Sequence, residues 1–194
     1  MKIFDELRMN EWESLKFSDP SKILPELQKI RVLVASSSLD ERGKDLRTTL
    51  LTPHRQAWEA AIFCYGMSIL LETKVFVSPY EAADYDAVAL WAEGDAKKFV
   101  PIQIKEVVPE SLNSKTDLNQ EIAKLAQRYP VSKDIVVVIH VNRNGRLDLS
   151  SIVVPKLNLG ELWLIGASTP DQTKWFMAGD LLNNPKIFEF DYPT

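Results

Sequence analysis

The chain has 194 residues, of which 45% are hydrophobic and 26% charged, as in globular proteins rather than disordered, collagen-like or coiled-coil ones. The 23 basic and 27 acidic residues give a net charge of −4, which excludes a histone-like protein coated in basic residues. The chain has one cysteine, no signal-peptide pattern in its first residues and no apolar run of 18 residues. We therefore expect a cytoplasmic protein without a membrane segment, disulfide or cysteine zinc cluster.

The first fifty residues are polar and predict a helical extension. One helix is expected over 5–17, and an amphipathic helix over 21–36. Thr52 and Pro53 then predict a helix start, with threonine as the cap and proline at the first helical position. The residues after them are apolar on nearly every face, so we expect this helix to be central and buried.

Strand patterns dominate the middle of the chain. Three strands are predicted, over 74–78, 86–91 and 99–107. The segment Glu93–Lys98 predicts a hairpin turn between the second and the third, and Pro101 interrupts the third near its start.

A helix and a buried strand are expected next, followed by shorter elements. The helix lies over 117–129 and the β-branched strand over 134–141, in which His140 is expected to be packed in the core. The shorter elements are a turn at Asn144 and Gly145, a strand over 162–166, a helix over 171–178 and an extended piece over 186–190.

The element order predicts a single α/β domain over 1–194. Its core, over about 52–142, consists of a helix, a three-stranded hairpin sheet, a helix and a strand. A helical N-terminal extension covers 1–50, and a C-terminal β/α extension covers 143–194.

Polar residues interrupt these apolar elements at three places. Glu59 lies inside the apolar helix, Asp86 begins the second strand, and Gln103 and Lys105 share one face of the third. Because an unpaired buried carboxylate is costly, such residues are usually paired, metal-bound or functional. Structural alternatives stay open: Glu59 pairs with Arg55 one turn earlier, Asp86 belongs to a turn, and the third strand is an edge strand with a solvated face.

The order of these residues resembles the PD-(D/E)XK nuclease superfamily, which has the restriction-endonuclease-like fold. That family places a glutamate on the first core helix, an aspartate at the start of the second strand, and a triplet of an acid or glutamine, any residue and lysine in the third. Glu59, Asp86 and Gln103-Ile104-Lys105 match this order over about residues 52–142. Other triplets of this kind occur in the chain, but only this one lies in the middle of a strand.

The resemblance implies a metal-dependent nuclease that hydrolyses phosphodiester bonds in nucleic acid, with DNA as the expected substrate. A Mg²⁺ or Mn²⁺ ion would act as a Lewis acid and lower the pKa of a bound water. Asp86 is implied as the principal metal ligand, with Gln103, the carbonyl of Ile104 and Glu59 as further ligands. Lys105 is implied to orient the attacking water.

Gln103 is neutral where an acid is usual, so the site is expected to hold metal less tightly. One alternative is therefore a catalytically degenerate nuclease-fold protein that binds nucleic acid or another protein, and another is an unrelated α/β interaction protein. Arg55, Lys97 and Lys98 are candidates for contacts with nucleic acid. A homodimer is also open, because many such nucleases dimerise to cut both strands.

Overall fold

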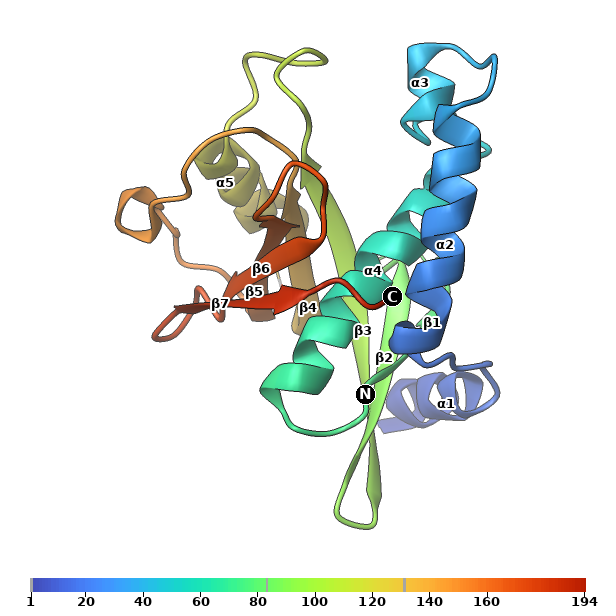
Figure 1. Ribbon diagram of the computed structural model, residues 1–194. Helices are drawn as coiled ribbons and strands as arrows, with labels where there is room; N and C mark the ends of the chain where they lie inside the picture. The colour runs from blue at the N-terminus through green and yellow to red at the C-terminus, as the bar shows by residue number, and fades with distance from the viewer. Residues whose placement is uncertain (1, 83, 131) are drawn as a thin grey trace. The chain divides into compact units, whose positions relative to one another are not determined.

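The structure, a computed structural model, describes residues 2–82, 84–130 and 132–194 (Figure 1). The fold is mixed α/β, as the sequence predicts, and strands β1 to β7 are hydrogen-bonded in chain order in one sheet. That sheet is larger than the expected three-stranded one. The residues group into two units, one up to Ile102 with Pro193 and Thr194, the other from Gln103 to Tyr192. The single domain with its core over 52–142 stays a prediction.

The first unit contains helices α1 to α4, strands β1 and β2, and the beginning of β3. Their bounds are α1 (Lys2–Glu13), α2 (Pro20–Ala35), α3 (Glu41–Lys44), α4 (Thr52–Leu70), β1 (Phe76–Pro79), β2 (Ala87–Glu93) and β3 (Ala96–Val107). Helix α2 begins after Asp19, whose side chain accepts a hydrogen bond from the Ser21 backbone N–H at 3.0 Å. Helix α4 packs against α2 and against β1 and β2 (Figure 1).

Helix α4 begins at Thr52 as predicted, but Thr52 is not its cap. The N-cap is Leu51, which makes no side-chain cap hydrogen bond, while Thr52 Oγ1 donates to the carbonyl of Thr48 at 2.9 Å. The consecutive residues from Trp58 to Cys64 are buried, which confirms the expected central helix. Among the described residues, α4 and the other helices lack the combined length and apolarity that crossing a membrane requires.

The hairpin between β2 and β3 is tighter than predicted. Because β3 already begins at Ala96, the turn consists of Gly94 and Asp95. Gly94 has φ +60°, a conformation that favours glycine. The turn predicted as far as Lys98 is therefore wrong, and Lys97 and Lys98 belong to β3.

The second unit contains the end of β3, helix α5 and strands β4 to β7. Their bounds are α5 (Leu118–Arg128), β4 (Ser132–Val141), β5 (Leu159–Ala167), β6 (Lys174–Gly179) and β7 (Lys186–Asp191), with a single 3₁₀ turn at Leu149–Ser151. Strands β4 and β5 are parallel, and β5, β6 and β7 are antiparallel neighbours. Ile122 and Leu125 of α5 pack with Ile139 and Leu162 in the core of this unit.

Two predictions about strands are wrong. Pro101 does not interrupt β3, because it pairs with Val88 in the register with β2, and a proline is tolerated where its missing N–H is not needed by the ladder. The helix expected over 171–178 is strand β6 instead. Trp175 and Met177 are buried on either side of the partly exposed Phe176, which is the alternation of a strand.

Candidate functional site

The first unit holds the buried carboxylate of Glu59, on α4. Glu59 is 0% exposed, and its Oε1 lies 3.4 Å from Nη1 of Arg55, one turn earlier. Residues four apart lie on one side of a helix, so this pairing follows from the local sequence. The pairing of Glu59 with Arg55, which was the structural alternative to a functional role, is therefore present in the structure. The same contact engages Arg55, one of the residues predicted to meet nucleic acid.

Asp86 lies just before β2, on the same side of α4 as Glu59. Its Oδ1 accepts a hydrogen bond from Nε2 of Gln56 at 3.0 Å, and its backbone N–H donates to the carbonyl of Ile102 at 2.8 Å. Gln56 and Glu59 are three residues apart on α4, so the two share one side of that helix. The structure thus brings Glu59 and Asp86 to the same side of α4 within the first unit.

The second unit holds Gln103 and Lys105, which both contact Tyr129. Gln103 is 5% exposed, and its Oε1 accepts a hydrogen bond from the Tyr129 hydroxyl at 2.8 Å. Nζ of Lys105 lies 5.8 Å from the centre of the Tyr129 ring, within the range of a cation–π contact. The shared partner agrees with the predicted common face. The solvated edge strand considered for this face is wrong, because Gln103 is buried and β3 lies inside the sheet.

The amide of Gln103 is already engaged at both ends. Its oxygen accepts the bond from Tyr129, and its Nε2 donates to the carbonyl of Ile104 at 3.3 Å. The predicted residues are thus found as two pairs, one in each unit. A common metal site for all four stays a prediction.

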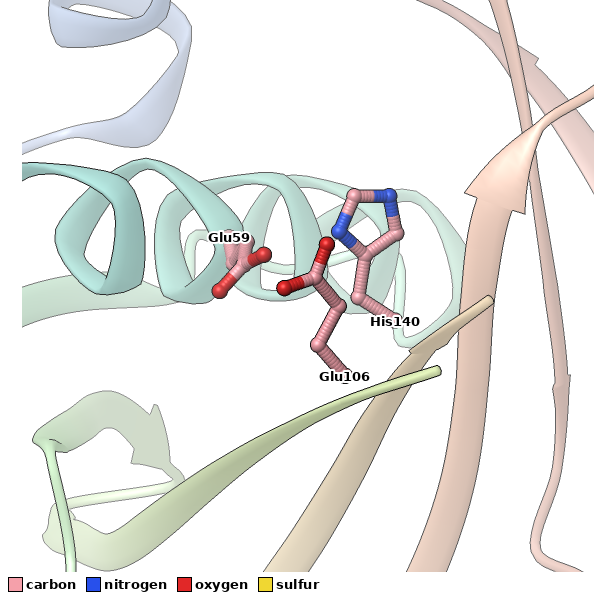
Figure 2. Close-up of side chains that lie close together, drawn as sticks. All are labelled: Glu59, Glu106 and His140. Atoms are coloured by element: carbon pink, nitrogen blue, oxygen red, sulfur yellow. The ribbon is translucent and has the colours of Figure 1, made fainter. Parts of the chain in front are cut away.

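Sequence reasoning missed a second polar group at the end of β3. Glu106 follows Lys105 and points to the opposite face by strand alternation. Its Oε1 accepts a hydrogen bond from Nδ2 of Asn142 at 2.9 Å. A carboxylate oxygen of Glu106 and an imidazole nitrogen of His140, on β4, lie within 4.8 Å of each other (Figure 2). Figure 2 also labels Glu59, which belongs to α4 of the first unit.

His140 is packed, as predicted, and also lines a cavity. It is 5% exposed, and its ring lies 5.5 Å from that of Trp175, measured between centroids. The cavity of about 680 Å³ lies among the segments that follow β3, β4 and β5 in the second unit. Its polar lining includes Ser111, His140, Asn142, Arg143, Ser168 and Thr169. The carboxyl ends of parallel strands are a common place for ligands in α/β folds.

The exposed basic residues predicted to bind nucleic acid lie at the start of β3. Lys97 is opposite Ala92 and Lys98 is opposite Trp91 in the register with β2. Nζ of Lys98 lies 3.0 Å from Oε2 of Glu93, so this lysine pairs with a neighbouring carboxylate. Surface pairs of this kind contribute little to stability, and contact of Lys98 with nucleic acid stays a prediction.

No protein-family model, curated protein or solved structure matches the chain. The likeness to the PD-(D/E)XK nucleases is therefore one of motif order alone, and the function is argued from the residues and their contacts.

Proposed function

We propose that the protein is a metal-dependent nuclease that hydrolyses phosphodiester bonds in nucleic acid, with DNA as its substrate and a restriction-endonuclease-like core. The observation that carries the proposal is the position of the motif residues on their elements. Glu59 lies in the buried helix α4, Asp86 immediately precedes β2, and Gln103 and Lys105 lie together on β3. A cytoplasmic location belongs to the same proposal, in keeping with the single buried cysteine, Cys64.

The donor atoms suit a hard divalent cation. Asp86 and Glu59 offer carboxylate oxygens, Gln103 offers its amide oxygen, and Ile104 offers its backbone carbonyl, which are the kinds of oxygen ligand that Mg²⁺ and Mn²⁺ take. Bound there, the ion would supply Lewis-acid activation of the phosphate and of the attacking water. The protein ligands would hold the ion next to the scissile bond.

Lys105 is proposed to act on the phosphate and on the attacking water. Its ammonium carries three donors and is held near the Tyr129 ring, so it can point at an oxygen without a large loss of side-chain entropy. The positive charge opposes the negative charge that accumulates on the phosphate oxygens in the transition state. The water oxygen bonds to phosphorus and gives up a proton to solvent, one ester P–O bond breaks, and the released alkoxide takes up a proton from solvent.

A second candidate function is that of a catalytically degenerate nuclease-fold protein that binds nucleic acid or another protein. Two contacts favour it: Oε1 of Gln103 accepts a hydrogen bond from Tyr129, and Glu59 is paired with Arg55. Two of the proposed metal ligands thus have protein partners. The two functions share a fold and differ in whether metal ions displace these partners.

Cleavage of supercoiled plasmid and of labelled single-stranded DNA, with Mg²⁺ or Mn²⁺, tests the proposal. Lys105→Ala and Asp86→Asn are expected to lower the rate by about a hundredfold or more, as for residues that act on the reacting atoms. Matched controls are Lys124→Ala, an exposed lysine of α5, and Asp95→Asn, in the β2–β3 turn. Both controls should cut like the natural protein.

The outcomes separate the two functions. Cutting that persists in both site variants would place the activity elsewhere and refute the proposed site. Absence of cutting together with a gel shift on DNA or RNA would favour the binding protein.

For the basic residues, Lys97→Ala and Lys98→Ala should each reduce the salt dependence of binding by about 0.9 in the slope of log K against log salt. Sedimentation at rising concentration tests the homodimer.

A further inference from the structure

The side chains of Glu106 and His140 form a donor pair of a different kind from the oxygen ligands above. An imidazole and a carboxylate together suit Zn²⁺, Ni²⁺ and Mn²⁺, whereas Mg²⁺ prefers oxygen ligands alone. The nearest ligand atoms of the pair lie within 4.8 Å. Two ligands of a tetrahedral zinc ion lie about 3.4 Å apart, given bond lengths of about 2.0–2.2 Å. A side-chain shift of about an ångström is therefore enough for both to reach one ion.

Neighbouring residues hold both side chains in place. Nδ2 of Asn142 donates to Oε1 of Glu106 at 2.9 Å, which orients the carboxylate. The ring of His140 lies against Trp175, with 5.5 Å between centroids. Hydrogen bonds that orient ligands, like the one from Asn142, are a regular part of metal sites and contribute to their affinity.

The histidine of the pair also lines a cavity. His140 and Asn142 both line the cavity of about 680 Å³ that follows β3, β4 and β5. An ion held by two protein ligands keeps further coordination positions for water or for a ligand in this cavity. Arg143 and Thr169, which line the same cavity, are suited to an anionic oxygen ligand.

Strand alternation separates Glu106 from Gln103 and Lys105. Gln103 and Lys105 occupy the face of β3 that meets Tyr129, and Glu106 occupies the other face. We propose that His140 and Glu106 bind a transition-metal ion, of the Zn²⁺, Ni²⁺ or Mn²⁺ class, at the cavity in the second unit. The proposal does not depend on the nuclease function, since none of the residues it uses has a role in the proposed nuclease site.

Calorimetric titration with Ni²⁺ tests the site, using the full chain without a histidine tag. We expect one Ni²⁺ per chain and an affinity that falls about tenfold or more in His140→Asn and in Glu106→Gln. Asn142→Ala, which removes the orienting hydrogen bond, should weaken binding by about tenfold. The chain offers a matched control in its other histidine, the exposed His54, and His54→Asn should bind Ni²⁺ as the natural protein does.

The proposal is wrong if His140→Asn and Glu106→Gln bind Ni²⁺ as tightly as the natural protein, if the folded natural protein binds none, or if His54→Asn abolishes binding. Glu106→Gln keeps the size of the side chain and an acceptor for Asn142, so it serves even if His140→Asn does not fold. Co²⁺ absorption in the visible region is a second readout of a site with a nitrogen ligand. Because no nucleic acid is present, a failed nuclease assay leaves the result unaffected.

Discussion

Replacing Tyr129 with phenylalanine removes one hydroxyl and leaves the ring in place. The hydroxyl donates to Oε1 of Gln103 at 2.8 Å, and the two residues are 3% and 5% exposed. A neutral hydrogen bond contributes about 0.5–1.5 kcal/mol to stability, and a buried acceptor that loses its donor costs about 1–3 kcal/mol. We therefore expect Tyr129→Phe to lower the free energy of unfolding by about 1–2 kcal/mol.

Urea unfolding followed by circular dichroism measures this change from the shift in midpoint at constant slope. Tyr80→Phe is the matched control, because the Tyr80 hydroxyl donates to Glu11 at the exposed surface, where its loss should cost about 0.5 kcal/mol or less. A midpoint for Tyr129→Phe equal to that of the natural protein would refute the reasoning, because it would mean that the hydroxyl gains as much from water as from Gln103.

Three further predictions concern stability and reactivity. Asp117→Ala removes the side chain that caps α5 by accepting from the Gln120 N–H at 2.8 Å, and should cost about 1 kcal/mol in thermal unfolding. Ile139→Ala should cost about 2–5 kcal/mol in urea, while Leu50→Ala at the surface should change stability by about 0.5 kcal/mol or less. Burial raises the pKa of the Cys64 thiol far above its ordinary value, so Ellman's reagent should react with one thiol per chain only after unfolding.

The elements with strong local patterns were predictable from the sequence. Helix α5 follows from its apolar stripe and from Asp117, which caps it, and β4 follows from a run of β-branched residues. Strand β6 was missed because Trp175, Phe176 and Met177 form an apolar run that fits a helix or a strand equally well. What decides the outcome is pairing with β5 and β7, which is not visible in the local sequence.

In the candidate site, too, contacts that follow from local sequence patterns were predictable, whereas contacts between distant elements were not. The pairing of Arg55 with Glu59, and the common face of Gln103 and Lys105, follow from the repeat of a helix and of a strand. The contact of Gln56 with Asp86 joins residues 30 positions apart, so it depends on how α4 packs against β2. Contacts between elements that are distant in the sequence can be recognised only in the three-dimensional structure.

Strand β3 has polar side chains on both faces, although it lies inside the sheet. A strand that served stability alone would resemble β4, where the residues from Ile135 to Ile139 are all apolar and buried. Gln103 and Lys105 on one face, and Glu106 on the other, each depart from that pattern, and such departures are expected where function requires them. Because the side chains point to opposite faces, Lys105→Ala should leave Ni²⁺ binding unchanged while Glu106→Gln weakens it. A loss of Ni²⁺ binding in Lys105→Ala would mean that the two faces form one site.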